Sequence, residues 1–392
     1  MTVRIGFLGA GLIAGYHARS LVAAGAEFTF AGVYDSDAGR AATFSGWTGA
    51  PVWADPETVV AGCDAVYVCT WTSEHPDLVS LAAAQGVAVF CEKPLAVDLA
   101  TAEAMVATVV GAGIVNQVGL VLRSSNAFAL LEHLVEDPAS GRVLSVTFHD
   151  DQCIPLGGWY DSAWRGDPQR AGSGVLLEHS IHDVDLIERL GGPVESVSAN
   201  SSQTHRILGI EDLVGATFRY AGGGIANLTT VWHDIPERLN DRRVEVVCER
   251  LWAVLEGDWI GPLRWQRPGQ APEELRGDAL LERVASLGIT REIPDGAFVR
   301  AVATGRRAEP TFADALRAHR VVDAAYRSAH AGGSPISIPA PEQSAEVELP
   351  VGVERRSHPR RIGVQERSDD IAASDIGPAT SPIVGQTPND AE

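Results

Sequence analysis

"GFLGAGLIAG", residues 6–15, spans the end of an expected strand and the start of an expected helix, and carries the spacing G-x-G-x-x-A at Gly9, Gly11 and Ala14. Gly9 permits a tight turn, Gly11 lets a pyrophosphate approach the backbone, and Ala14 lets the helix pack close to the strand. The first helical turn, with Leu12 and Ile13, offers free N–H groups to phosphates. The stretch predicts a dinucleotide-binding turn, and the alternative is a glycine-rich turn that binds nothing.

The cofactor is predicted from the end of the next expected strand, FTFAGVYD at residues 28–35. Asp35 stands where a carboxylate binds the adenosine ribose hydroxyls of a dinucleotide. Asp37 follows and no arginine comes directly after it, so the 2′-phosphate of NADP would meet negative charge. We therefore expect NAD rather than NADP. The alternative is that Asp35 only caps the following helix.

Residues 1–122 alternate between short runs rich in β-branched residues and longer helical patterns. Strands are expected at residues 3–9, 28–35, 64–70, 87–93 and 113–119, with helices at 12–24, 75–85 and 99–110. This alternation is typical of βαβ units in a parallel sheet. The fold class of this part is α/β, an NAD-binding Rossmann domain.

The pattern changes after residue 122. A helix at 124–136, a strand at 143–150 and a helix at 175–190 precede four long strands in succession, at 194–203, 212–221, 224–233 and 242–257. Strands joined by short turns favour antiparallel pairing, so residues 123–338 are expected to form an α+β domain with a large, mostly antiparallel open sheet. Thr311 is expected to cap a last helix, and residues 339–392 to form a disordered tail.

The bulk composition limits the partners. The chain has 51 acidic and 31 basic residues, and its net charge of −20 repels nucleic acid and anionic membrane surfaces. The N-terminus lacks the pattern of a signal peptide, and no run reaches the roughly 18 apolar residues of a membrane span. The five cysteines show no C-x-x-C spacing. We expect a cytoplasmic protein with a small-molecule partner.

A charged pair, Glu92 and Lys93, stands in CEKPLA at residues 91–96, at the C-terminal end of an expected parallel strand. Open α/β sheets bind their ligands at that edge. Pro94 fixes the local turn, which helps to aim the Lys93 side chain. Lys93 is therefore a candidate active-site residue, and the alternative is an ordinary surface lysine.

Two histidines and three carboxylates fall within EHSIHDVD, residues 178–185. In an expected helix, Glu178, His182 and Asp185 share one stripe because steps of three and four return to the same face. A solvated polar stripe is one interpretation. A metal site is a second, but the H-E-x-x-H spacing is missing and His179 is rotated away from Glu178, so no metal is expected.

Acid/base chemistry is the third interpretation and the one we prefer. His182 has a side chain that titrates near neutral pH, and Glu178 at the i, i+4 position can orient it. Oxidation of an alcohol by hydride transfer leaves an oxygen that must lose its proton, which His182 can accept. The Lys93 ammonium can stabilise the negative charge that develops on that oxygen, while the nicotinamide performs the redox step.

Four elements together resemble the Gfo/Idh/MocA family of oxidoreductases: the G-x-G-x-x-A turn, Thr70 followed by His75, the EKPLA motif, and WRGDPQRAGSGVLLEHSIHDVDLIERL at residues 164–190. The resemblance spans residues 3–338. It implies a Rossmann domain followed by a domain with an open sheet, whose exposed face makes a homodimer or homotetramer interface.

The resemblance also implies roles for single residues. Lys93 would hydrogen-bond the reacting oxygen, and His182 would exchange the proton. Glu178 would contact the substrate or the histidine. The family more often has aspartate at this position, so the longer side chain points to a substrate other than that of the inositol-type members.

Further residues complete the candidate site. His75 begins a helix close to where a nicotinamide ring would lie, with Thr70 at the preceding strand end and Glu92 beside Lys93 as further cofactor contacts. His75 could equally be a helix-terminal residue without a chemical part. The substrate wall is expected from side chains that suit a polyol, although each could equally serve packing: Arg123, Trp164, Arg165, Asp185 and His233.

The sequence therefore predicts an NAD-dependent oxidoreductase that transfers hydride between nicotinamide and a carbinol carbon of a sugar, a cyclitol or a related polyhydroxy compound. One alternative is an NAD-dependent glycosidase that oxidises its substrate transiently with the same residues. Another is a catalytically silent NAD-binding protein. The substrate depends on loops such as residues 153–171, whose shape the sequence does not show.

Overall fold

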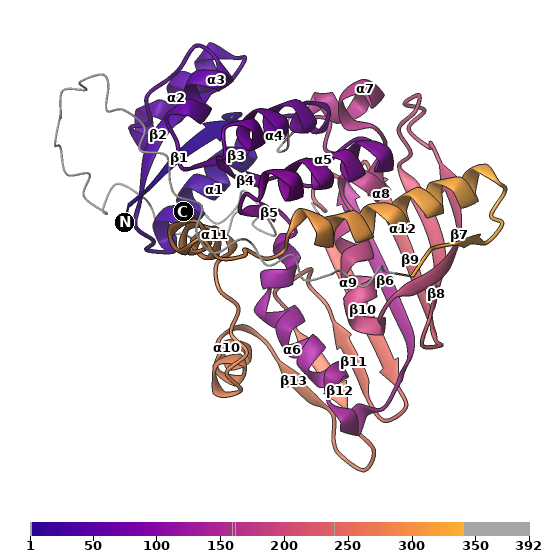
Figure 1. Ribbon diagram of the computed structural model, residues 1–392. Coiled ribbons are helices and arrows are strands. Elements are labelled where there is room, and N and C mark those ends of the chain that lie inside the picture. The colour runs from indigo at the N-terminus through magenta and orange to yellow at the C-terminus, as the bar shows by residue number, and fades with distance from the viewer. Residues whose placement is uncertain (1, 159, 161, 239, 341–392) are drawn as a thin grey trace.

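A five-stranded parallel sheet forms the first domain of the computed structural model, which describes residues 2–158, 160, 162–238 and 240–340. The strand order β2-β1-β3-β4-β5 confirms the predicted Rossmann topology (Figure 1). The tail predicted for residues 339–392 lies outside the described residues from 341 onward. The strands are β1 (Val3–Leu8), β2 (Phe28–Tyr34), β3 (Ala65–Val68), β4 (Ala88–Cys91) and β5 (Asn116–Val118).

Helices pack on both faces of this sheet, and side-chain caps begin three of them. Asp37, Asp55 and Asp98 accept backbone N–H groups at the N-termini of α2, α3 and α5. Gly49 and Gly113 end α2 and α5 in the left-handed conformation that favours glycine. The elements are α1 (Leu12–Ala23), α2 (Ala38–Thr48), α3 (Pro56–Ala61), η1 (Thr72–Glu74), α4 (His75–Ala84) and α5 (Leu99–Ala112).

A nine-stranded sheet forms the second domain, in the order β13-β12-β11-β10-β6-β9-β8-β7-β14. The parallel pair β6 and β9 stands within neighbours that are otherwise antiparallel, so the sheet is mixed and mostly antiparallel, as predicted. The strands are β6 (Val143–Cys153), β7 (Val194–Ser202), β8 (Leu213–Tyr220), β9 (Ile225–His233), β10 (Asn240–Cys248), β11 (Trp252–Leu255), β12 (Leu263–Gln266), β13 (Glu273–Leu275) and β14 (Ile336–Ser337).

The prediction of a single strand at residues 242–257 is wrong, because the structure has two strands there, β10 and β11. Cys248 donates its N–H to the carbonyl of Leu251 at 2.7 Å, which closes a tight turn at Glu249 and Arg250. The chain then runs back antiparallel, with Val247 opposite Trp252. Two adjacent charged residues are easily solvated at such a turn. The turn was missed because apolar residues alternate with polar ones on both sides of it, as they would in one continuous strand.

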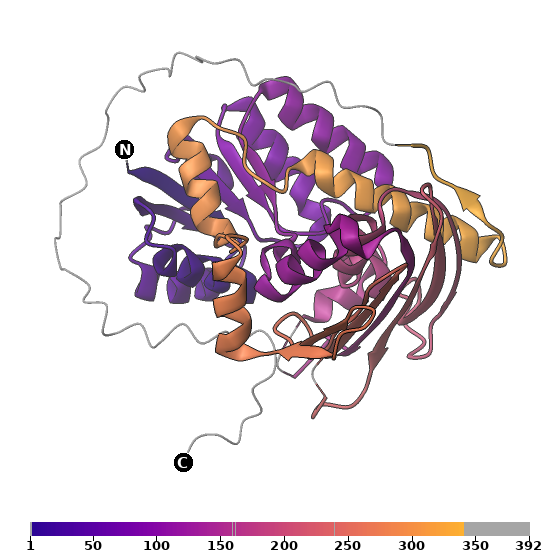
Figure 2. The same ribbon diagram turned by 90° about the horizontal axis from the view of Figure 1, so that it is seen from below.

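Among the described residues, helices cover one face of the large sheet and leave the other uncovered. Along β8 and β9, buried residues alternate with exposed ones, which is the pattern of a sheet that packs on one side. Helix α12 lies between the helices of the first domain and the strands of the second (Figure 2). The remaining helices are η2 (Val121–Ser124), α6 (Asn126–Glu136), η3 (Pro138–Ser140), η4 (Ala163–Gly166), α7 (Pro168–Ala171), α8 (Val175–Glu178), α9 (Ile181–Gly191), α10 (Gly277–Ser286), α11 (Pro294–Thr304) and α12 (Phe312–His330).

The chain returns to the first domain after the large sheet. Phe298 and Val299 of α11 are buried in one core with Ile5 and Phe7, and Phe312 of α12 is buried in the core on the other face of the parallel sheet. Thr311 caps α12 through a capping box with Asp314, as predicted. The boundary predicted at residue 122 stays a prediction, and residues 298–316 contribute to the core of the domain that precedes it. Within the described residues, no helix has the length and apolar character to cross a membrane.

Candidate active site

The glycine turn has the geometry that its sequence predicts. Gly9 has φ +96°, and a Cβ at this position would lie 2.6 Å from the carbonyl oxygen of Cys69. A Cβ at Gly11 would meet no heavy atom within 4 Å, so the backbone there is open to a ligand. Ala14 is fully buried against the sheet. The N-terminus of α1, with exposed Leu12, therefore forms a cradle that fits the pyrophosphate of a dinucleotide.

Asp35 braces this turn. Its Oδ2 accepts the N–H of Ala10 at 2.7 Å, and its Oδ1 accepts the N–H of Asp37 at 2.8 Å. The alternative in which Asp35 caps the following helix is wrong, because the side chain of Asp37 caps α2. The Asp35 carboxylate is therefore held beside the cradle, and its contact with a ribose stays a prediction.

Lys93 follows β4 and reaches from the first domain to the second. Its Nζ donates a hydrogen bond to the backbone carbonyl of Glu178 at 2.6 Å. Burial lowers the pKa of the ammonium, and the nearby Arg165 guanidinium lowers it further. The alternative of an ordinary surface lysine is therefore wrong. One signal in the sequence was overlooked. Lys93 is the only lysine among the 31 lysines and arginines of the chain.

The helix predicted at residues 175–190 is interrupted. It is divided into α8, which ends at Glu178, and α9, which begins at Ile181. At the break, the Ser180 hydroxyl donates to Thr230 Oγ1 at 2.6 Å, so the residues between the helices bond to the sheet. The expected i, i+4 stripe therefore does not continue across this point.

Glu178 does not orient His182, and that prediction is wrong. The Glu178 carboxylate is 2% exposed; its Oε1 accepts the Thr72 hydroxyl at 2.7 Å, and its Oε2 accepts Arg165 Nε at 3.2 Å. Because the helix breaks after Glu178, this side chain turns toward the first domain. Glu178 thus joins Thr72 of η1 to Arg165 of η4, and its backbone carbonyl accepts a hydrogen bond from Lys93.

His182 is 9% exposed, and its Nδ1 is buried without a hydrogen-bond partner among the described residues. Burial lowers the pKa of the imidazole well below its ordinary value, and the positive charges of Lys93 and Arg242 add to the effect. A neutral imidazole beside an ammonium can accept a proton. The interpretation of this region as a solvated stripe is wrong, because Glu178, His182 and Asp185 are all buried.

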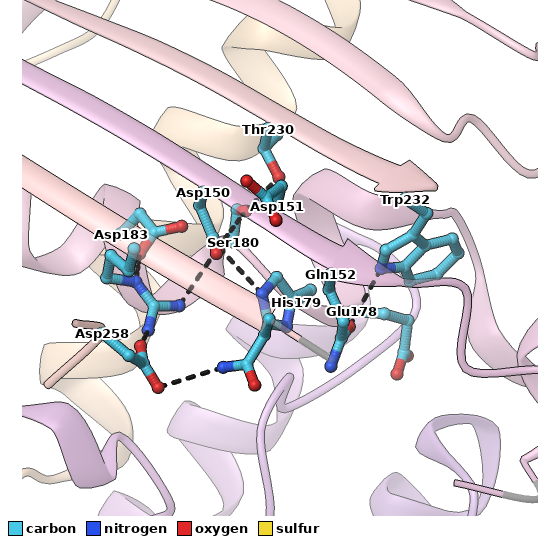
Figure 3. A network of polar contacts seen from close by, with 12 residues as sticks. Asp150, Asp151, Gln152, Glu178, His179, Ser180, Asp183, Thr230, Trp232 and Asp258 are labelled. Carbon is cyan, nitrogen blue, oxygen red and sulfur yellow. Dashed lines mark hydrogen bonds and ion pairs between the residues drawn. The ribbon is translucent and has the colours of Figure 1, made fainter. Parts of the chain in front are cut away.

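A buried ion-pair network lies behind His182. Arg242 of β10 donates from Nε to Asp183 at 2.6 Å and from Nη2 to Asp150 at 3.1 Å, and it also pairs with Asp258. His179 Nε2 lies 2.8 Å from Asp150 Oδ2, and Figure 3 shows these two side chains facing each other. Although burial opposes it, Arg242 lowers the pKa of the Asp150 carboxyl, whereas burial raises that of Asp183.

This network was not predicted, because its partners come from β6, α9, β10 and the turn after β11. His179 and Asp183 both stand in the EHSIHDVD stretch, whose spacing gives no sign of these partners. The described residues contain no group of three or more His, Cys, Asp or Glu side chains arranged to hold a metal ion. The polar atoms of this cluster are directed at a guanidinium instead.

The predicted substrate residues separate into three places. Arg165 lies beside Glu178 and stacks on Trp164, with its guanidinium carbon 4.6 Å from the ring centroid. Arg123 and Asp185 form a two-bond ion pair at 2.7 and 2.5 Å. Of these residues, therefore, Arg165 and Trp164 are the ones that adjoin the Lys93 side of the site.

His233 is not at the site, and this prediction is corrected. Its Nε2 lies 3.3 Å from Asp151 Oδ1, and His149 Nε2 lies 3.1 Å from the other oxygen of that carboxylate. On β6 these residues alternate with the buried Asp150, so Asp151 faces the uncovered side of the sheet. Successive side chains of a strand point to opposite faces of the sheet, so His233 lies on the face opposite to the one that His182 packs against.

Two predicted cofactor residues have protein partners. His75 is buried, with Nδ1 3.0 Å from the Pro94 carbonyl and Nε2 3.3 Å from the Thr70 carbonyl. Glu92 is buried and its Oε1 lies 2.8 Å from His17 Nε2. Thr70 lies two residues after β3, beside the glycine turn. Its contact with a cofactor stays a prediction, as do those of His75 and Glu92.

Comparison with known proteins agrees with this architecture. Residues 3–120 match the family model described as "Oxidoreductase family, NAD-binding Rossmann fold", and residues 128–254 match the "GFO/IDH/MocA C-terminal domain". A myo-inositol dehydrogenase of Streptomyces leeuwenhoekii is 30% identical over 292 residues, which is 72% of this chain and 83% of that protein.

Other relatives match over a shorter span. The inositol 2-dehydrogenase of Rhizobium meliloti is 31% identical over 52% of this chain and 58% of that protein. The chain thus spans little more than half the length of several curated relatives that it matches, including the scyllo-inositol 2-dehydrogenase of Bacillus subtilis, of which it covers 57%.

Solved structures share the fold. An oxidoreductase domain protein from Kribbella flavida superimposes with a TM-score of 0.76 at 25% identity, covering 87% of this chain and 100% of that one. The WlbA dehydrogenase from Bordetella pertussis gives a TM-score of 0.77 at 23% identity, covering 86% and 98%. With two matching domain models in the same order and a relative aligned over most of its length, the chain belongs to the Gfo/Idh/MocA family of oxidoreductases.

Proposed function

We propose that this protein is an NAD-dependent dehydrogenase or reductase that acts on a secondary alcohol of a sugar, a cyclitol or a related polyhydroxy compound. One observation carries the proposal. The only lysine of the chain meets the second domain at the carbonyl of Glu178, beside a neutral, buried histidine. All the other residues among the 31 lysines and arginines of the chain are arginines. A lysine ammonium is compact and its pKa responds to burial, and these two properties distinguish Lys93 from an arginine at the same position.

The chain's own residues handle the oxygen and the proton. Bound NAD supplies the hydride acceptor. Lys93 donates a hydrogen bond to the reacting oxygen and stabilises the charge that builds on it as the C–H bond breaks. His182 accepts the hydroxyl proton; its lowered pKa keeps it unprotonated before the reaction.

The preference for NAD rests on Asp35 and Asp37. Both carboxylates stand at the end of β2, where a 2′-phosphate would meet two negative charges. The Bacillus subtilis relative is named an NAD(+) enzyme, and the WlbA dehydrogenase structure contains NADH. These names support NAD as the cofactor of this chain.

The substrate class follows from the relatives and from the polar wall. Several curated relatives are named inositol dehydrogenases, and one from Ensifer adhaerens is a 1,5-anhydro-D-fructose reductase. Arg165 and Trp164 offer donors and an aromatic face to a polyol. We further propose a cytoplasmic homo-oligomer joined through the uncovered face of the large sheet, with no nucleic-acid or membrane partner.

A substrate screen tests the proposal. Inositols, aldoses and anhydro-sugars are offered with NAD and with NADP, and reduced nicotinamide is followed by absorbance. Turnover of a polyol with NAD, lost in His182→Asn with unchanged NADH affinity, is the expected result. A glycosidase would release sugar without net NADH, and a silent protein would bind NADH without turnover of any compound; either result overturns the proposal.

A further inference from the structure

Three histidines from three helices hold the segment that carries Lys93. His17 of α1 contacts the side chain of Glu92 at 2.8 Å. His75 of α4 lies 3.0 Å from the carbonyl of Pro94, and His319 Nε2 of α12 accepts the N–H of Leu95 at 3.1 Å. All three are buried. Residues 92–95 are therefore fixed from three sides.

His17 differs from the other two because it carries a charge. Its Nε2 faces Glu92, and its Nδ1 lies 2.7 Å from Asp295 Oδ1 at the N-terminus of α11. Only a doubly protonated imidazole can donate to carboxylates on both sides. Burial opposes the charge, but Asp295 and Glu92 outweigh it and raise the pKa of His17 to about 10. Burial instead lowers the pKa of His75, and lowers that of His319 to about 4.

Glu92 passes this constraint to Lys93. While Oε1 faces His17, Oε2 accepts the backbone N–H of Lys93 at 3.3 Å. The carboxylate also lies on Gly119, where a Cβ would come within 2.4 Å of Oε1, so no larger side chain fits beneath it. The Glu92 carboxylate is thus confined between α1 and β5, directly before the residue whose Nζ reaches Glu178.

We propose that His17 is a positioning residue for Lys93 and acts through Glu92. The cationic imidazole fixes the Glu92 carboxylate, the carboxylate fixes the backbone of Lys93, and the ammonium is then directed at the second domain. The same helix that begins at the glycine cradle thereby sets the place of the lysine. The inference rests on the proposed role of Lys93 in catalysis.

The test compares His17→Gln, Glu92→Gln and the double variant, using NAD and the best substrate of the screen. We expect each single variant to lower kcat by about ten- to a hundredfold, the cost of misplacing a reacting group by about 1 Å, and His17→Gln to leave NADH affinity unchanged. Because both residues act in one chain of contacts, the double variant should lose no more than the worse single variant. Losses that multiply in the double variant would overturn the proposal.

A matched control separates positioning from stability. Glu132→Gln removes another buried carboxylate, which lies on α6, pairs with Arg189 and Arg291, and does not touch residues 92–95. This variant should lose thermal stability and keep its kcat. Equal kcat losses in the control and in His17→Gln would show a general effect of destabilisation and refute the positioning role.

The single lysine allows a readout that needs no turnover. Reductive methylation with ¹³C-formaldehyde labels Lys93 and the N-terminal amine alone, and methylation keeps the charge. Since Glu92 raises the pKa of Lys93, Glu92→Gln should move the Lys93 NMR titration to lower pH, and His17→Gln should change its chemical shift. Unchanged Lys93 resonances refute the inference, whereas an active Lys93→Ala variant refutes the proposed function instead.

Discussion

The Nζ of Lys93 lies 2.6 Å from the backbone carbonyl of Glu178, so one hydrogen bond links the end of β4 to the break between α8 and α9. The Glu178 side chain returns the link to the first domain through the Thr72 hydroxyl, at 2.7 Å. Both bonds are donated by the first domain and accepted by Glu178, and together they place the ammonium at the junction of the domains, where it bonds to a carbonyl oxygen.

Replacing Lys93 by arginine should abolish turnover although the positive charge remains. The planar guanidinium is larger than an ammonium and cannot occupy the buried position between Glu92 and Glu178 without moving the backbone. We expect kcat to fall by at least about a hundredfold, with NADH affinity within twofold of the wild type. Stopped-flow NADH binding and steady-state kinetics measure the two quantities. Arginine activity near that of lysine would contradict the role given to the ammonium.

In the pH profile of alcohol oxidation, both the acid limb and the alkaline limb should lie at lower pH than the ordinary pKa values of histidine and lysine predict. His182 must be neutral to accept the proton, and its pKa is well below 6.5, so activity persists as the pH falls through 6.5. Lys93 must be charged, and its pKa is below 10.5, so activity is lost before that pH is reached. Measurements of kcat/KM as a function of pH, on both sides of 6.5 and up to 10.5, test both expectations. An acid limb above 6.5 would exclude His182 as a base of this kind.

Glu178→Gln should leave the acid limb of that profile in place, because the Glu178 carboxylate faces Thr72 and Arg165 rather than His182. Gln keeps an acceptor for the Thr72 hydroxyl and loses the charge opposite Arg165. Thr72→Val is the matched variant, since it removes the buried hydrogen bond and should cost about 1–3 kcal/mol in the free energy of unfolding. If the acid limb shifts in Glu178→Gln, then Glu178 does interact with His182, which would contradict the contacts seen in the structure.

The charge on His17 should make stability depend on alkaline pH. Its pKa is raised from 6.5 to about 10, so its contribution is fully present below pH 6.5 and is lost progressively as the pH rises toward 10. Urea unfolding of the wild type should therefore show a falling free energy over that window. His17→Gln should be less stable at pH 6 and lose less of its stability between pH 6.5 and 10; parallel curves for the two proteins would refute the assignment.

His233→Ala should keep the kcat of the wild type. The imidazole lies with Asp151 on the uncovered face of the large sheet, across from the site. Its loss should be visible in the assembly of the protein, if that face joins subunits, and sedimentation velocity measures this. A large fall in kcat without a change of assembly would contradict this placement and support the original prediction that His233 contacts the substrate.

The sequence by itself determined the elements whose signals are local. The spacing of Gly9, Gly11 and Ala14 depends on steric needs within one turn, and short runs rich in β-branched residues predict the strands of the parallel sheet. Lys93 could also have been singled out more firmly, since a chain with one lysine marks it by composition. These features need no knowledge of distant residues.

Only the tertiary structure decided the partners of those residues. Periodicity paired Glu178 with His182, but the Ser180 hydroxyl bonds to Thr230 of β9, the helix breaks, and Glu178 turns to Thr72. The contact between His17 and Asp295 joins residues 278 positions apart, and no local pattern reports it. Such contacts follow from which layers meet when the chain returns from the large sheet to the first domain, because hydrogen-bond partners of buried polar groups are set by packing rather than by propensity.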